Sequence, residues 1–169
     1  MTVTTATVVT LTQARIYESR QNYQEALQRA IAPLTEEQMS LRLVSGMRSV
    51  RETAAHTVYA RALWLHRILD DSALEPLLTW ATPNDPMAPP RPCTAAEVLH
   101  GLDQTWRIIT ACLDRWMAAG LHDTLPDATL PTEEITRLRT IWGLLEHDLH
   151  HGGELSFQLG AHGLAAVDL

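Results

Sequence analysis

Three histidines fall within five positions near the C-terminal end of the chain, in the segment LEHDLHHGGEL at positions 145–155. His147 and His151 are four residues apart. In a helix, at 100° per residue, their side chains lie within about 40° of each other on one face. One helix supplies two imidazoles to the same metal ion at this spacing, as in the H-E-x-x-H motif. The residue types and spacing therefore indicate a metal site.

A catalytic zinc site usually has three protein ligands and one position open to water or substrate. The two histidines therefore need a partner from another helix. His56 is the best candidate because it lies inside a predicted helix over 49–70. His66, about 80° further round that helix, is the alternative. The other histidines, near a helix start or in connecting segments, are His100, His122 and His162.

Glu154 lies about one helical turn beyond His151 and is the first candidate for moving a proton at such a site. Tyr59, which shares a helical face with His56, is the weaker candidate. The inner residue of the motif, Asp148, projects about 100° away from His147, so no base role is assigned to it.

Gly152 and Gly153 decide whether Glu154 stays in line with the histidines. A glycine inside a helix costs about 0.5–1 kcal/mol relative to alanine. Two adjacent glycines should therefore end the helix or make room beside the histidines. The good helix-forming residues of ELSFQL favour a helix that continues to Leu159.

The same segment also fits a plain amphipathic helix. Its apolar residues would pack inward while the histidines faced water. Against this, Leu144 and Leu155 lie nearer the histidine side, and a helix apolar over most of its circumference is usually buried. Buried imidazoles need partners. The pattern alone leaves both interpretations open; the apolar residues nearly opposite His147 are Leu138, Trp142, Leu145 and Leu149.

The composition limits the classes of partner. The net charge of −7 argues against nucleic acid, whose phosphates are bound by clustered cations. All 13 basic residues are arginine, so chemistry on a lysine Schiff base is excluded. Cys93 and Cys112 are isolated and are predicted to be reduced thiols. No apolar run approaches the roughly 20 residues of a membrane span, and no secretory signal is recognisable, which favours the cytoplasm.

The elements that would position the histidines are four predicted helices, over about 12–31, 49–70, 94–120 and 132–159. Capping boxes at Ser49–Glu52 and Thr94–Glu97 mark two helix starts. Six of the nine prolines fall between Pro76 and Pro92, which predicts a long crossover loop between the second and third helices. No strand is expected, so the predicted fold is an all-α four-helix bundle. A single domain over 1–169 is expected, with 1–11 a flexible N-terminal segment.

SVRETAAH at 49–56 and HDLHHGGELSFQLGAHGL at 147–164 together resemble the DinB/YfiT-like superfamily of metal-binding four-helix proteins. The likeness extends from about Tyr17 to Leu164 in the order and spacing of the helices. It implies up-up-down-down connectivity, a homodimer, and a zinc or nickel ion held by three histidines. Carried over residue by residue, the ligands are His56, His147 and His151, and His150 is not one of them.

The resemblance also implies a range of activities. Relatives include S-transferases and an isomerase that use a metal-activated low-molecular-weight thiol. Many members read His-Arg-Gly-Gln where this chain has His151-Gly152-Gly153-Glu154. We expect a metal-dependent transferase or hydrolase acting on a small electrophilic substrate. The alternative is a non-catalytic metal- or ligand-binding module of a stress response.

Overall fold

The computed structural model describes residues 5–69, 71–80, 92–127, 132 and 134–168. The chain is mostly helical in this part. In chain order the elements are α1 (Thr5–Ile31), α2 (Glu36–Met39), α3 (Val50–His66), a 3₁₀ turn η1 (Ser72–Leu74), α4 (Glu75–Leu78), α5 (Ala95–Ala119), β1 (Thr124–Pro126), β2 (Glu134–Thr136) and α6 (Arg137–Ala161).

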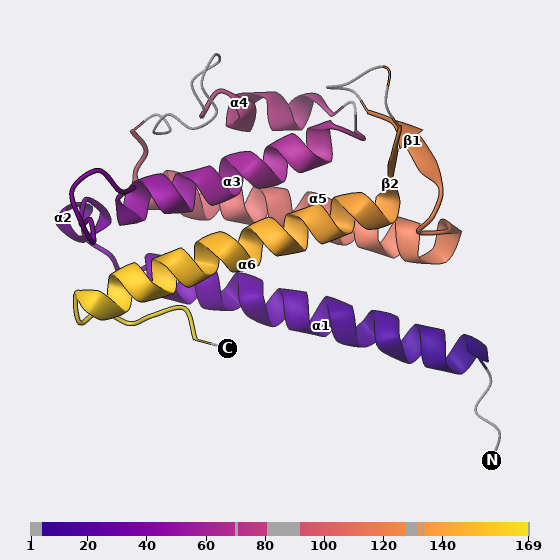
Figure 1. The fold of residues 1–169 in the computed structure, drawn as a ribbon, viewed down its shortest axis with the longest axis horizontal. Helices are drawn as coiled ribbons and strands as arrows, with labels where there is room; N and C mark the ends of the chain where they lie inside the picture. The colour runs from indigo at the N-terminus through magenta and orange to yellow at the C-terminus, as the bar shows by residue number, and fades with distance from the viewer. Residues whose placement is uncertain (1–4, 70, 81–91, 128–131, 133, 169) are drawn as a thin grey trace.

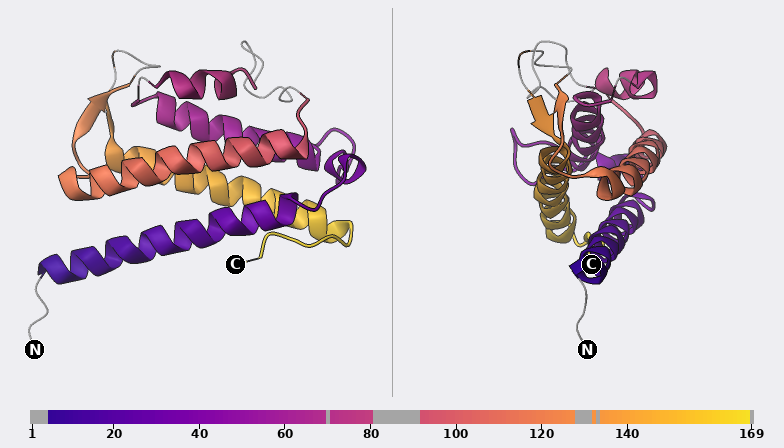
Figure 2. Two further views of the ribbon diagram at one scale, coloured as in Figure 1. Left: turned by 180° about the vertical axis from the view of Figure 1, so that it is seen from behind. Right: turned by 90° about the vertical axis from the view of Figure 1, so that its right-hand side faces the viewer.

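The long helices α1, α3, α5 and α6 lie lengthwise beside one another as a bundle (Figure 1). The most extensive helix contacts join α3 to α6, α3 to α5, and α1 to α5. Figure 2 shows the same bundle from behind and from one end. None of the helices in the described part of the chain combines the length and hydrophobicity of a membrane span.

The order of helix directions corrects one expectation. The helices α3 and α5 run the same way along the bundle, whereas α1 and α6 run the opposite way (Figure 1). The connectivity is therefore up-down-down-up, and the expected up-up-down-down order is wrong. The segment from α1 through α2 to α3 reverses the chain direction. The segment after α3 carries η1 and α4, which both pack against α3.

Local sequence signals account for the starts of α3 and α5. The Ser49 hydroxyl accepts a hydrogen bond from the Glu52 backbone N–H, and the Glu52 carboxylate accepts one from the Ser49 N–H at 2.7 Å. Thr94 and Glu97 make the same reciprocal pair. Both predicted capping boxes are confirmed.

The connection between α5 and α6 differs from the prediction. Two strands of three residues pair antiparallel, with Thr124 opposite Thr136 and Pro126 opposite Glu134. The expectation of no strand is wrong, because three residues are too few for a visible alternation. The start of α6 also lies later than expected, because the Thr136 hydroxyl caps it by accepting from the Arg139 N–H at 3.0 Å.

Two further boundaries differ. Helix α1 begins at Thr5, so part of the segment expected to be flexible is helical. In the predicted proline-rich loop, Pro76 lies in the first turn of α4, where the missing N–H is tolerated. Most of that loop, residues 81–91, lies outside the described residues.

The core is formed by side chains from all four long helices. Apolar residues spaced three, four or seven apart along α5 lie inside: Val98, Leu102, Ile109, Leu113 and Trp116. One leucine from each long helix illustrates the core, each no more than 1% exposed: Leu27, Leu65, Leu102 and Leu155. These contacts position α3 and α6 against each other along their length.

A candidate metal centre between α3 and α6

Three imidazoles meet where α3 packs against α6. One ring nitrogen from each of His56, His147 and His151 lies within 4.8 Å of the other two. The ring centroid of His56 lies 5.0 Å from that of His147 and 4.6 Å from that of His151, and the two α6 rings are 4.4 Å apart. The three residues expected as metal ligands are thus neighbours in space.

Helix α6 places its histidine-bearing side inward. His151 is 4% exposed, while the apolar residues expected to pack inward are largely open: Trp142 is 57% exposed and Leu149 is 49% exposed. The alternative of a histidine face in water is therefore wrong. The hydrophobic pattern identified two unlike faces correctly, and the polar one lies against α3.

A glycine lets the two helices approach closely beside the histidines. A Cβ atom on Gly143 would lie 2.6 Å from a ring atom of Trp64 on α3, closer than a side chain allows. The indole of Trp64 therefore lies directly against the backbone of α6. This pair is not predicted from the sequence, where the mid-helix glycine in IWGLL is the available signal.

Burial keeps the three imidazoles neutral. Desolvation lowers the pKa of His56 to about 3, and the neighbouring cation Arg48 lowers it further. Burial likewise lowers the pKa of His147 to about 4, with the adjacent His151 contributing. The pKa of His151 is also lowered by burial, although Glu154 opposes that shift. Neutral imidazole is the form that binds a metal ion.

Hydrogen bonding leaves these imidazoles suited to a metal. The Nδ1 atom of His151 lies 2.6 Å from Oε2 of Glu154. When Nδ1 donates to this carboxylate, the lone pair of the neutral ring is on Nε2. The buried Nδ1 of His147 has no hydrogen-bond partner. The Glu154 carboxylate orients the His151 ring, and the His147 ring has a nitrogen without a partner. Three neutral imidazole nitrogens of this kind fit a divalent ion such as zinc.

Glu154 lies behind His151, toward solvent. Its second oxygen is 3.4 Å from Nε2 of His150, whose side chain is 65% exposed. His150, His151 and Glu154 form a second group with ligand atoms within 4.8 Å of one another, sharing His151 with the first group. Glu154 therefore contacts one member of the three-histidine group from its outer side.

An open cleft reaches one member of the three-histidine group, His147. It has a volume of about 310 Å³ and is lined by Trp64, Gly143, Glu146, His147 and His150. Two cations border the indole, with the guanidinium carbons of Arg67 and Arg139 lying 4.6 Å and 5.0 Å from the Trp64 ring centroid. The cleft gives a small molecule access to the His147 side of the group.

The other residues considered from the sequence lie outside the three-histidine group. Tyr59 is half-buried, with its ring centroid 6.2 Å from that of His56. His66 is also half-buried and belongs to neither histidine group found among the described residues. The other three histidines are exposed: His100, His122 and His162.

The two glycines after His151 have different surroundings. Helix α6 continues through both of them, as predicted. A Cβ atom on Gly152 would lie 1.6 Å from the hydroxyl oxygen of Tyr23 on α1, whereas one on Gly153 would meet nothing within 4 Å. The room made by Gly152 is thus taken by Tyr23, and the expectation that it opens the histidine side is corrected.

A second buried polar cluster begins at the residue beside His147. The Asp148 carboxylate, 2% exposed, accepts from Nε of Arg61 at 2.8 Å and from Nη2 of Arg20 at 3.2 Å. Arg61 also donates to Gln24 at 2.7 Å, and the Tyr23 hydroxyl donates to the Asp148 carbonyl. This Arg–Asp cluster is not predicted from the sequence. Its signal was a lone arginine within the apolar run YARALWL.

Comparison with known proteins identifies a family and similar folds. The sequence model of the DinB superfamily matches residues 17–155. A proposed member of the DinB family from Exiguobacterium sibiricum 255-15 has a similar crystal structure, with a TM-score of 0.58 and 21% identity over 89% of this chain and 91% of that one. A DinB-like protein from Bacillus cereus ATCC 10987 gives a TM-score of 0.60 and 17% identity over 90% and 94% of the two chains. No curated protein matches the chain.

The chain belongs to the DinB superfamily. The two solved structures are similar in fold. The superfamily is metal-associated, and this chain has a three-histidine group that could hold a metal ion.

Proposed function

We propose that this chain is a divalent-metal-dependent enzyme with His56, His147 and His151 as its metal ligands. The observation that carries the proposal is the convergence of three neutral imidazoles, one buried and two half-buried, beside an open cleft. Zinc and nickel are the preferred ions, since imidazole suits both. A bound ion of this kind lowers the pKa of a water or thiol and so supplies a nucleophile near neutral pH.

Residues of this chain would bind the ion, orient a ligand and transfer a proton. His56, His147 and His151 hold the site while leaving a position for water, a thiol or substrate. Glu154 fixes the ring orientation and tautomer of His151 through its 2.6 Å contact with Nδ1. This positioning role replaces the acid–base role suggested by sequence spacing. Tyr59, next to His56, stays the weaker candidate for proton transfer.

The substrate would enter through the cleft beside His147. Its volume of about 310 Å³ suits a small molecule, and the indole of Trp64 offers a flat apolar wall. The reaction we favour is transfer of a low-molecular-weight thiol to a small electrophile, or hydrolysis of such an electrophile. The family resemblance supports thiol transfer, and a three-histidine ion with an open position supports either reaction.

The first experiment is the metal content of protein purified without an affinity tag. We expect about one ion per chain in the wild type, and none in His56→Ala or His151→Ala. His100→Ala is the matched control, because this exposed histidine lies on α5. His150→Ala should also keep the ion if the first histidine group is the site. An ion lost in His150→Ala and kept in His56→Ala would instead identify the outer group.

A second experiment separates catalysis from binding. Metal-loaded protein is assayed with small electrophiles in the presence and absence of low-molecular-weight thiols. We expect turnover that chelation abolishes and that restored zinc or nickel recovers. A stoichiometric ion without turnover in either assay would leave a non-catalytic metal-binding module.

We also propose a homodimer, as the superfamily resemblance implies. The support in this chain is the outward face of α6, where Leu138 is 41% exposed and Trp142 is 57% exposed. Exposed apolar residues grouped on one helix face commonly mark an interface. Light scattering after size-exclusion chromatography should give a dimer for the wild type and a monomer for Trp142→Glu. A monomeric wild type would contradict the proposal.

A further inference from the structure

The Glu154 carboxylate has one oxygen that the three-histidine group does not use. Its Oε2 atom lies 2.6 Å from Nδ1 of the buried His151. Its Oε1 atom lies 3.4 Å from Nε2 of His150, the neighbouring ring on the outer surface of α6. The two oxygens of one carboxylate therefore contact different rings, one inside the centre and one outside it.

The separation of the outer pair suits a metal ion better than a hydrogen bond. A hydrogen bond between nitrogen and oxygen usually spans about 2.7–3.2 Å. Two ligand atoms that each lie about 2.0–2.2 Å from one tetrahedral zinc ion are about 3.3–3.6 Å apart. The 3.4 Å between Nε2 of His150 and Oε1 of Glu154 falls within that range. The two atoms are already spaced as adjacent ligands of zinc.

Contacts with His151 hold both side chains of this pair in place. The Nδ1 atom of His151 fixes the Glu154 carboxylate at 2.6 Å. The His151 ring also packs edge-to-face against the His150 ring, with the centroids 4.6 Å apart and the planes at 75°. The pair is nevertheless open to water, since the His150 side chain is 65% exposed and that of Glu154 is 33% exposed. Water molecules can therefore complete the coordination of an ion bound there.

The outer pair lies apart from the proposed dimer face. At 100° per residue, His150 and Glu154 lie at least about 80° round α6 from Leu138 and Trp142. His150 also lines the cleft that reaches His147. An ion bound to the pair would therefore lie near the rim of this cleft, on the outer side of His151.

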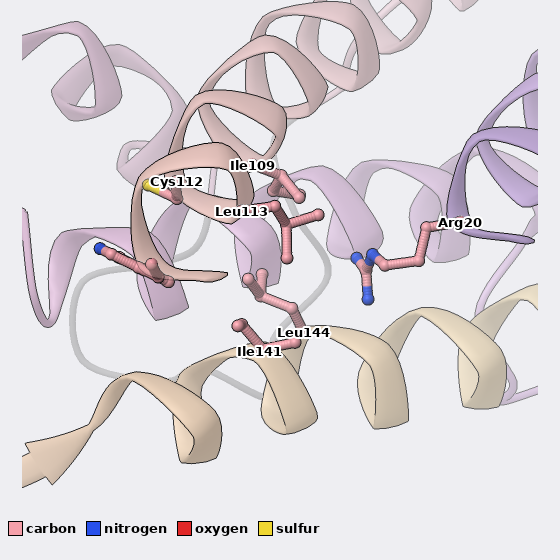
Figure 3. A pocket seen from close by; sticks show the side chains of 7 residues that line it. Arg20, Ile109, Cys112, Leu113, Ile141 and Leu144 are labelled. Atoms are coloured by element: carbon pink, nitrogen blue, oxygen red, sulfur yellow. The ribbon is translucent and has the colours of Figure 1, made fainter. Parts of the chain in front are cut away.

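The two cysteines of the chain do not offer a competing zinc site. Zinc binds the thiolate form of cysteine, and burial raises the pKa of Cys112 to about 11. Figure 3 shows Cys112 on α5 beside a hollow that Leu113 and Leu144 also line, which has no room for a water molecule. Cys93 is 3% exposed. A second zinc ion is therefore expected at imidazole and carboxylate ligands.

We propose that His150 and Glu154 bind a second zinc ion outside the three-histidine centre. This ion has only two protein ligands, so it is the weaker of the two and is lost during purification. Its binding also loosens the inner ion, because it draws the Glu154 charge away from His151 and places a second positive charge nearby. The loosening rests on the proposed function, whereas binding at the outer pair does not.

The test is calorimetric titration of the metal-free full chain with zinc. We expect two ions per chain in the wild type, the second bound at least about ten times more weakly because it has fewer protein ligands. His150→Ala should bind one ion, with the weaker site lost. His122→Ala is the matched control, since this exposed histidine belongs to neither histidine group, and it should bind two ions.

Two further variants test the shared carboxylate. His56→Ala removes the inner ion, and the outer ion should then bind about fivefold more tightly, because coupling between two sites is reciprocal. Glu154→Gln should abolish the outer ion and also weaken the inner one. Glu146→Gln, which changes a carboxylate outside both histidine groups, should leave both ions bound as in the wild type.

The outcomes separate this proposal from the proposed function. A single ion that depends on His56 and not on His150 would overturn the outer site and leave the centre intact. A single ion that depends on His150 and not on His56 would overturn the centre and support the outer site alone. Two ions in His150→Ala would overturn the outer site. Equal outer affinity in the wild type and in His56→Ala would overturn the coupling.

Discussion

Two buried polar clusters begin at neighbouring residues of α6 and differ in what satisfies them. His147 belongs to a group of imidazoles that burial keeps neutral, one of which has an unpaired buried nitrogen. Asp148 belongs to a group of charges already joined by contacts of 2.8 Å and 3.2 Å to Arg61 and Arg20. The first group has little to hold it together without an external ion. The second group holds α1, α3 and α6 together by itself.

This difference separates residues for function from residues for stability. A side chain in the histidine group should matter for metal binding and little for folding without metal. A side chain in the Arg–Asp cluster should matter for folding under all conditions. The two groups share a helix, so variants of adjacent residues compare them directly.

The largest expected effect follows from Asp148→Ala. It leaves Arg20 and Arg61 buried without their anion, which should lower the free energy of unfolding by about 3–5 kcal/mol. Urea denaturation followed by circular dichroism measures the change. The control is Asp103→Ala, which breaks the exposed Arg107–Asp103 pair and should cost at most about 1 kcal/mol. Equal effects of the two variants would mean that the buried cluster does not stabilise the bundle.

Gly152→Ala should have the next largest effect. The new Cβ would collide with the Tyr23 hydroxyl, so that hydroxyl must leave the Asp148 carbonyl. We expect a loss of about 1–3 kcal/mol in the free energy of unfolding. Gly153→Ala, one residue on and facing open space, should instead stabilise the helix by about 0.5–1 kcal/mol. Thermal unfolding of the pair checks both signs, and the prediction fails if the two variants shift stability in the same direction.

Glu154→Gln tests the positioning role in the histidine group. Loss of the charged partner of His151 should weaken zinc affinity about 10–100-fold, as for other carboxylates that orient a ligand histidine. Competition with a chromophoric chelator measures the affinity. Glu146→Gln, in the cleft wall and outside both histidine groups, should leave the affinity nearly unchanged. A wild-type affinity in Glu154→Gln would assign the 2.6 Å contact no role in metal binding.

The pH dependence of the metal-free protein should be a smaller effect with a definite sign. The pKa of His56 in the folded chain is about 3, below its usual value of 6.5, so below pH 6.5 the unfolded chain takes up more protons. Stability should therefore fall as the pH decreases from about 6.5 toward 4. Urea midpoints at pH 7.5, 6 and 5 should fall more steeply for the wild type than for His56→Gln. Parallel profiles would contradict the assigned shift.

The histidine group could be predicted from the sequence, because part of it follows from local spacing and part from the family resemblance. The spacing of His147 and His151 follows from helix geometry, and the choice of His56 over His66 was settled by resemblance. The inward direction of the histidine face could not be predicted, since periodicity separates two faces without saying which one meets a neighbour. The surroundings of Gly152 and Gly143 depend on Tyr23 and Trp64 from distant helices.

The helix boundaries show the same difference between features set by local sequence and features set by distant contacts. The starts of α3 and α5 are set within four residues by reciprocal caps and were predicted. The start of α6 was not predicted, because the residue that caps it, Thr136, is also the last residue of a strand that pairs with a separate segment. Such boundaries depend on tertiary contacts, which the local sequence does not predict.

The contact of Trp64 with Gly143 has a consequence for observing the protein. The indole forms one wall of the cleft that also contains His147, so a fluorophore lies beside the candidate centre. Nickel and copper ions quench indole emission at short range, whereas zinc does not absorb in that region. Emission from Trp64 would therefore distinguish bound nickel or copper from bound zinc. Trp64→Phe would identify its share of the signal from the five tryptophans. Trp64 is thus an intrinsic fluorescence probe for a quenching ion at this site.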